Sequence, residues 1–126
     1  MISKGYAVKS AKAPLENYSF ERRELREKDV QLEILYAGIC HSDIHQAREE
    51  WGPAIFPMVP GHEIVGKVTA VAAGVSKFKV GDLIGVGVFV DSCRECDSCK
   101  AGLEQYCIEG MTGTYLSLIH ISEPTR

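Results

Sequence analysis

The chain has 126 residues, enough for at most one domain, and its 45% apolar and 25% charged residues are ordinary for a globular protein. Fourteen Lys and Arg against seventeen Asp and Glu give a net charge of −3, which argues against a nucleic acid or an anionic membrane surface as partner. The apolar runs are far shorter than the roughly 18 residues of a membrane span, so we expect none.

The first part of the chain predicts short strands separated by turns. Gly5 to Val8 is a candidate strand, and the weak alternation of Tyr18 to Leu25 indicates a second one. Glu21 to Asp29 is a run of charges of both signs, which predicts a solvated strand edge and turn. Asp29 to Leu35 alternates polar and apolar residues with period two, as is typical of a half-buried strand. This strand leads to Cys40.

The next segment predicts a short helix followed by a loop. Ser42 to Glu50 forms the expected helix, with Ser42 as its N-cap and Asp43 in its first turn, and Trp51-Gly52-Pro53 ends it. Ile55 to Pro60 contains two prolines and predicts an extended surface loop.

The middle of the chain carries the strongest strand signals. Ile64 to Val71 is rich in β-branched residues and predicts a strand, and Leu83 to Val90 predicts a further strand after the Val80-Gly81-Asp82 turn. Short strands broken by Gly and Pro at intervals of about ten residues indicate an all-β barrel or sandwich. No strand is followed by GxGxxG and a helix, so we expect no dinucleotide-binding domain in this chain.

Four of the five cysteines follow the spacing C-x2-C-x2-C-x7-C and predict a metal site formed by Cys93, Cys96, Cys99 and Cys107. Four thiolates this close in sequence can form the closed tetrahedral shell of a structural zinc ion. Two disulfides in a secreted domain are one alternative, which the odd cysteine total and the lack of a leader at Met1 disfavour. An iron–sulfur cluster, which also uses four cysteines, is another. The same features predict a reducing cytoplasm.

A second group of chemically active residues surrounds the fifth cysteine. Cys40 and His62 supply two of the three ligands of a Cys2His catalytic zinc site, which keeps a fourth position open for water or substrate. A cysteine at a strand end is alternatively a small buried hydrophobic residue. The glycine before each segment, the neighbouring carboxylates and the four cysteines downstream favour the metal hypothesis.

Several motifs together resemble the zinc-dependent alcohol dehydrogenases of the medium-chain superfamily. They occur in order at the spacing of that family: Gly38-Ile39-Cys40-His41-Ser42-Asp43, Pro60-Gly61-His62-Glu63-Ile64-Val65-Gly66, Val80-Gly81-Asp82 and the four-cysteine segment. The closest resemblance is to the cinnamyl-alcohol-dehydrogenase-like aldehyde reductases, which use NADP(H), and it is carried by His41, Trp51, Val90-Asp91-Ser92-Cys93 and Met111-Thr112-Gly113-Thr114-Tyr115. The resemblance covers about Lys4 to Tyr115 and weakens the iron–sulfur alternative.

This resemblance implies a mainly β fold and a set of metal-binding residues. The fold is a truncated GroES-like β-barrel catalytic domain over residues 1–115, with a four-cysteine zinc lobe and without the Rossmann domain of the parent. Cys40 and His62 resemble the first two catalytic zinc ligands, and Glu63 resembles the adjacent carboxylate that can approach the metal. Asp43 resembles the acceptor that orients a ligating imidazole.

The resemblance also implies residues that handle the proton, the cofactor and the substrate. Ser42 resembles the hydroxyl that takes the proton from the alcohol, and His45 resembles the relay toward solvent. His41 resembles the residue that contacts the cofactor pyrophosphate, and Trp51 resembles a wall of the substrate pocket. An exposed helical histidine is the alternative for His45, and core packing is the alternative for Trp51.

The implied parent is a zinc-dependent oxidoreductase that interconverts small-molecule alcohols and aldehydes by hydride transfer with NADP(H), mainly as an aldehyde reductase. It holds one catalytic and one structural zinc, and a homodimer is a family expectation. A non-catalytic zinc-binding interaction module is the alternative. It accounts for Cys93 to Cys107 but assigns nothing to Cys40, His62 and Glu63.

The chain departs from the family at several points. The third catalytic ligand, a cysteine well downstream in the family, is missing together with the Rossmann domain, so we expect this chain to be inactive. Ala72 stands where the family usually has glycine, and a positive φ there would cost about 1 kcal/mol. Leu116 to Arg126 has no family counterpart and resembles the in-frame translation of a transposase adapter used for sequencing libraries. We therefore expect residues 116–126 to be non-native and the gene to continue beyond Tyr115.

Overall fold

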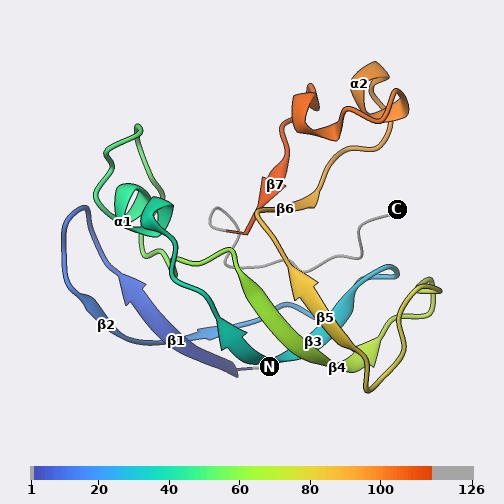
Figure 1. Ribbon diagram of the computed structural model, residues 1–126, viewed down its shortest axis with the longest axis horizontal. Coiled ribbons are helices and arrows are strands. Elements are labelled where there is room, and N and C mark those ends of the chain that lie inside the picture. The colour runs from blue at the N-terminus through green and yellow to red at the C-terminus, as the bar shows by residue number, and fades with distance from the viewer. Residues whose placement is uncertain (1, 115–126) are drawn as a thin grey trace.

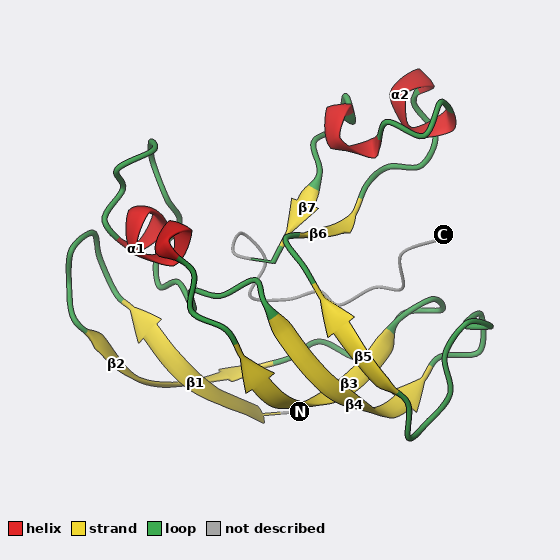
Figure 2. Ribbon diagram, in the orientation of Figure 1, coloured by secondary structure: helices red, strands yellow, loops and turns green. Residues whose placement is uncertain are grey.

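Antiparallel strands dominate the computed structural model, which describes residues 2–114 (Figures 1 and 2). The described strands form three sheets, ordered β1–β2, β3–β4–β5 and β6–β7. The predicted adapter-derived tail, residues 116–126, lies outside the described residues. The elements are β1 (Ile2–Val8), β2 (Leu15–Glu21), β3 (Val30–Ala37), α1 (His41–Ala47), β4 (Ile64–Val71), β5 (Leu83–Val86), β6 (Phe89–Asp91), α2 (Asp97–Lys100), the 3-10 helix η1 (Glu104–Tyr106) and β7 (Thr112–Gly113).

The mainly β fold is confirmed, and β4 has the predicted bounds, but the strand predicted over Leu83 to Val90 divides into β5 and β6. The division has a simple cause, because the chain changes partner there. β5 pairs with β4, whereas β6 pairs with β7. Between them, the carbonyl of Val88 accepts a hydrogen bond from the backbone N–H of Thr114 at 2.9 Å. One predicted strand therefore serves two sheets.

Helix α1 begins earlier and ends earlier than predicted. Its N-cap is Cys40, in an extended conformation, so the prediction of Ser42 as the N-cap was wrong. The Asp43 carboxylate accepts the N–H of Cys40 at 2.9 Å and thereby satisfies a donor at the start of the helix. The helix ends at Ala47, and Glu49 just beyond it has a φ of 55°, whereas a right-handed helix requires a negative φ.

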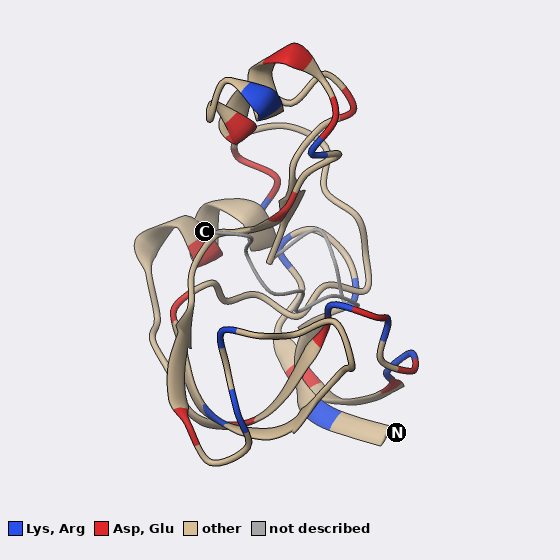
Figure 3. Ribbon diagram, turned by 90° about the vertical axis from the view of Figure 1, so that its right-hand side faces the viewer, with Lys and Arg blue, Asp and Glu red and all other residues tan. Residues whose placement is uncertain are grey.

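The charge run ahead of β3 is not simply solvated, which corrects the sequence prediction. Asp29 is only 2% exposed, and its carboxylate contacts the Arg23 guanidinium and accepts the N–H of Arg26 at 2.8 Å. Burial acts to raise the pKa of Asp29, but the hydrogen bonds from Arg23 and Arg26 outweigh it and hold this pKa below its ordinary value. Elsewhere basic and acidic residues are interspersed over the described chain (Figure 3).

The turn after β4 accommodates Ala72 without the strain that a positive φ would cause. Ala72 is not among the residues with positive φ, and its N–H donates to the carbonyl of Asp29 at 3.0 Å. The glycine requirement falls two residues later, where a Cβ on Gly74 would lie 2.8 Å from the carbonyl oxygen of Glu27. The Ala72 hydrogen bond and the close approach of Gly74 to Glu27 hold the chain that precedes β3 against the chain that follows β4.

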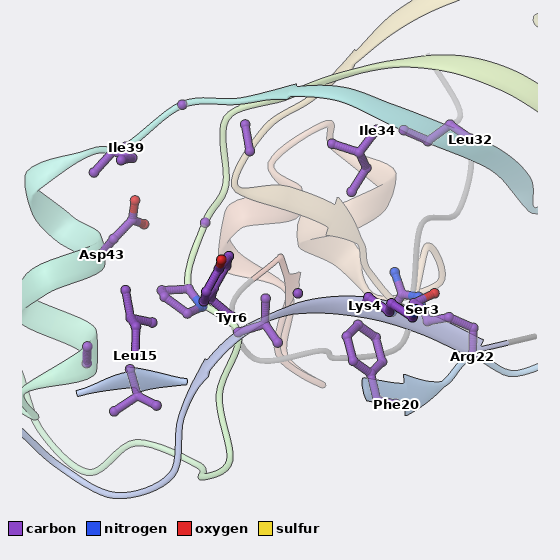
Figure 4. A pocket seen from close by; sticks show the side chains of 18 of the residues that line it. Ser3, Lys4, Tyr6, Leu15, Phe20, Arg22, Leu32, Ile34, Ile39 and Asp43 are labelled. Atoms are coloured by element: carbon purple, nitrogen blue, oxygen red, sulfur yellow. The ribbon is translucent and has the colours of Figure 1, made fainter. Parts of the chain in front are cut away.

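The described strands do not close a barrel, as expected for a truncated domain. The core is small and consists of Ala7, Val8, Val30, Met58, Val68, Val86 and Val90, together with two cysteines of the lobe. A cavity of about 850 Å³ opens among β1, β2, β3 and α1. Figure 4 shows Tyr6, Leu15, Phe20 and Ile34 around it. In the described part of the chain, no helix has the length and apolar character needed to cross a membrane.

Candidate metal centres

The four-cysteine lobe, residues 93–107, stands away from the large sheet and joins it through β6 and β7 (Figures 1 and 2). The sulfur atoms of its four cysteines all lie within 4.8 Å of one another. The Sγ atoms of Cys93 and Cys99 are 3.8 Å apart. A tetrahedral zinc with Zn–S bonds of about 2.3 Å requires sulfur atoms about 3.8 Å apart, so this lobe fits the ion.

Short helical turns position these thiols and supply donors to them. Cys96 is the N-cap of α2, Cys99 lies within α2 and Cys107 follows η1. The N–H groups of Cys93 and Cys96 donate to the sulfurs of Cys107 and Cys93, at 3.4 and 3.3 Å. The backbone N–H of Ile108, followed by that of Cys99, lowers the pKa of Cys96 to about 6, whereas at Cys99 the hydrogen bond with Ser92 is outweighed by burial and by Cys96 and Cys107, which raise its pKa to about 11. Donors of this kind favour thiolate, the form that binds metal.

None of the five cysteines is in a disulfide, although four of them lie close together. The 3.8 Å between the Sγ atoms of Cys93 and Cys99 is far longer than an S–S bond of roughly 2.05 Å. The base of the lobe is instead held by Arg94, whose Nε and Nη2 lie 3.1 and 2.8 Å from Asp91 Oδ1. The structure therefore supports the metal hypothesis over the disulfide alternative.

The second centre, which we call the Cys40 site, consists of Cys40, His62 and Glu63. Their ligand atoms all lie within 4.8 Å of one another, although they come from different segments of the chain. The pairing of β3 with β4 brings the segments together, and Gly38 extends this pairing by donating to the carbonyl of Glu63 at 2.7 Å. A Cβ on Gly38 would lie 2.9 Å from the Glu63 Cβ, so the approach requires glycine.

Asp43 connects the two halves of the Cys40 site. Its Oδ2 accepts the N–H of Cys40, and its Oδ1 lies 3.1 Å from His62 Nδ1. Because an ionised carboxylate only accepts, Nδ1 carries the proton, and Nε2 is the His62 nitrogen that would bind a metal. That Nε2 lies 3.8 Å from Glu63 Oε1. A thiol, an imidazole nitrogen and a carboxylate thus converge in a donor set that zinc accepts.

The remaining predicted residues lie on α1 and the turn after it. Ser42 Oγ donates to the sulfur of Cys40 at 3.1 Å. The His45 ring contacts both the His41 ring and the Trp51 ring, and the centroid distance is 4.7 Å in each case. Trp51 is 61% exposed, which does not fit the core-packing alternative, and His45 is held by its neighbours rather than freely exposed.

Sequence reasoning missed Glu50, whose carboxylate contacts His45 Nδ1. The sequence carried a weak signal, since an acidic residue five positions after a histidine does not share its helix face. The contact becomes possible because Glu49 adopts a positive φ and turns the chain back toward α1. The roles of the other residues remain predictions; the structure brings Ser42 and Asp43 into contact with the Cys40 site and groups His41, Trp51 and Glu50 around His45.

Comparison with known proteins identifies the family of this chain. Residues 26–124 match the alcohol dehydrogenase GroES-like domain, and the chain belongs to this family. It is 56% identical over 122 residues to the NADP-dependent alcohol dehydrogenase C 1 of Mycolicibacterium smegmatis, covering 96% of this chain and 35% of that protein. It is 54% identical over 117 residues to the aldehyde reductase YahK of Escherichia coli, covering 93% of this chain and 33% of that one.

Solved structures show the same relationship. A cinnamyl alcohol dehydrogenase from Helicobacter pylori in complex with NADP(H) is 48% identical, with a TM-score of 0.87 over 94% of this chain and 34% of that chain. The Sorghum bicolor enzyme SbCAD4 is 49% identical, with a TM-score of 0.85 over 90% of this chain and 32% of that chain. The present chain thus spans about a third of the length of the proteins it matches.

Proposed function

We propose that the longer protein is a zinc-dependent oxidoreductase that interconverts small-molecule alcohols and aldehydes with NADP(H), mainly as an aldehyde reductase. The observation that carries this proposal is the convergence of Cys40, His62 and Glu63 within 4.8 Å, with Ser42 and Asp43 in contact with them. A zinc ion held there would act as a Lewis acid on the substrate oxygen. Relatives named as NADP-dependent alcohol dehydrogenases support the choice of cofactor.

The residues of this chain would orient the ligands and move the proton. Asp43 fixes the proton of His62 on Nδ1 and leaves Nε2 for the metal. Ser42 carries the hydroxyl nearest to the Cys40 sulfur and would exchange the proton of the alcohol. His45 would pass that proton toward solvent, and Glu50 holds the Nδ1 side of its ring. His41 would contact the cofactor pyrophosphate, and Trp51 would border the substrate.

The second metal site has a structural role in this proposal. Cys93, Cys96, Cys99 and Cys107 would hold a closed zinc site with no open position for substrate. Its free thiols fit a reducing compartment, so we place the protein in the cytoplasm. A homodimer is the corresponding proposal for the full-length protein.

We further propose that the 126-residue chain itself is inactive. In this proposal residues 1–115 belong to a catalytic domain and residues 116–126 are a non-native tail, into which the family match over residues 26–124 extends. Cys40 and His62 lack the third cysteine ligand of the family, and no GxGxxG unit is present in the sequence to bind the dinucleotide. NADPH-dependent aldehyde reduction by the purified chain would refute its proposed inactivity. Genomic DNA that encodes Leu116 to Arg126 would refute the proposed adapter origin of the tail.

Zinc stoichiometry tests the proposed function against the alternative of a non-catalytic zinc module. The full-length protein should hold two zinc ions per chain, and the 126-residue chain should retain one after dialysis. A full-length protein with a single zinc, unaffected by Cys40→Ser and inactive toward aldehydes, would favour the module.

A further inference from the structure

The environment of His45 contains more than a proton relay requires. Its ring contacts two other rings, and the interplanar angle to Trp51 is 28°, a stacked arrangement, whereas the angle to His41 is 50°. The Glu50 carboxylate contacts Nδ1 in addition. The ring is therefore restrained by an aromatic face and by an anion, and both kinds of contact are attractive to an imidazolium.

We propose that Trp51 is a positioning residue for His45, whose imidazole it holds by stacking and whose protonated form it stabilises. This inference rests on the proposed function, in which His45 receives and releases the substrate-derived proton. It gives Trp51 a role that does not depend on which substrate is bound.

The proton chemistry follows from the two ring nitrogens. The hydrogen bond from His45 lowers the pKa of the Glu50 carboxyl; burial acts to raise it, but the charges of His45, Arg48 and Lys12 add to the lowering and the pKa stays below its ordinary value. Glu50 is therefore ionised at neutral pH, and it can only accept a hydrogen bond. The proton of neutral His45 accordingly resides on Nδ1. An arriving proton forms an N–H bond at Nε2, and the same bond breaks when the proton leaves for solvent.

The imidazolium formed in this way would lie against the indole face of Trp51 with its Nδ1–H directed at Glu50. Other charged groups act in the opposite sense. Arg48 Nη1 lies 3.8 Å from Glu50 Oε1, and Lys12, from the loop between β1 and β2, also acts on Glu50. His41 adds a second titratable ring in contact with His45. Trp51 is thus the neutral member of a charged cluster, and its contribution persists at high salt.

The experiment uses NMR titration of the His45 imidazole protons in the full 126-residue chain, assigned with the variant His45→Gln. Trp51→Leu should lower the midpoint of this titration by about half a pH unit, the shift expected from a solvent-exposed cation–π contact. Trp51→Phe keeps an aromatic face and should lower it less. Glu50→Gln should lower it by about one pH unit, because it removes the anion. The ring-current shift that Trp51 imposes on His45 should disappear in Trp51→Leu.

A second readout uses the fluorescence of Trp51, the only tryptophan in the chain. Protonation of the stacked His45 should quench the excited indole as the pH falls. His45→Gln should abolish this pH dependence, and the matched control His41→Gln should keep it. An unchanged titration midpoint in Trp51→Leu, or fluorescence quenching that persists in His45→Gln, would overturn the proposal. Neither readout depends on turnover, so failure of the proposed role of Trp51 is distinguishable from failure of the proposed function. Zinc content and activity test the latter.

Discussion

The two candidate metal centres of this chain are assembled in different ways. The four-cysteine lobe takes all of its ligands from one short segment, residues 93–107, and uses backbone N–H groups of the same segment as donors. The Cys40 site takes its ligands from the segment that follows β3 and the segment that precedes β4, and it depends on the pairing of these strands. The lobe can therefore form by local folding around a metal, whereas the Cys40 site requires the sheet.

The largest expected effect concerns the metal of the lobe. Cys93→Ser in the 126-residue chain should release the zinc, because binding and local folding are coupled and together are worth about 10–16 kcal/mol in apparent terms. Cys40→Ser is the matched control and should retain it. Zinc per chain, measured by mass spectrometry after dialysis, checks this. Equal retention in the two variants would contradict the assignment of the lobe as the tight site.

The next prediction tests whether the lobe holds its zinc independently of the stability of the sheet. Asp29→Asn should lower the free energy of unfolding by about 3 kcal/mol, because it removes one partner of a buried ion pair. The matched control Glu24→Gln alters an exposed carboxylate in the same run and should change little. Urea denaturation measures both variants. The lobe should keep its zinc in Asp29→Asn, and loss of that zinc would show that the lobe depends on the sheet after all.

A smaller effect is expected within the Cys40 site. Asp43→Asn in the full-length protein should weaken zinc binding at this site by about 10- to 100-fold, because the amide cannot accept from both Cys40 and His62. Metal competition with a chromophoric chelator measures the affinity. Glu95→Gln, an exposed change within the lobe, should leave it unchanged. An equal loss in both variants would indicate general destabilisation rather than a role for Asp43.

The smallest effect is a dependence of stability on acidity. The pKa of Asp29 is depressed in the folded chain, so its contribution to stability is fully present above the unfolded value of about 3.9. This contribution is lost as the pH falls below that value and through the folded pKa. Urea midpoints between neutral pH and pH 3 should show the loss, and Asp29→Asn should flatten the curve. A variant curve as steep as that of the original chain would assign the acid sensitivity to other carboxylates.

Local sequence patterns were sufficient for some elements of the fold and not for others. The segment Ile64–Val71 predicted β4 with the bounds that the structure shows, because β-branched residues predominate in it. The break between β5 and β6 was missed, because it depends on a change of strand partner. The burial of Asp29 was missed for a similar reason, since a charge run shows neither which of its members is paired nor what covers it.

The site was predicted to a similar extent. The cysteine spacing alone identified the lobe, because its ligands are local in sequence. The Cys40 site required a family resemblance, because its ligands meet only through strand pairing. Two details depended on tertiary geometry. Cys40 rather than Ser42 is the N-cap of α1, because the Asp43 carboxylate accepts the N–H of Cys40. Glu50 contacts His45 because Glu49, between them, adopts a positive φ.

The position of Asp43 has a consequence for the order of events during metal uptake. One carboxylate, about one-tenth exposed, holds both the backbone of Cys40 and the ring of His62 through contacts made within the protein itself. The conformational entropy of these two ligands is therefore lost during folding and need not be lost again on binding. A site preorganised in this way should select ions by fit, because an ion that prefers another geometry cannot redirect ligands that the fold already holds.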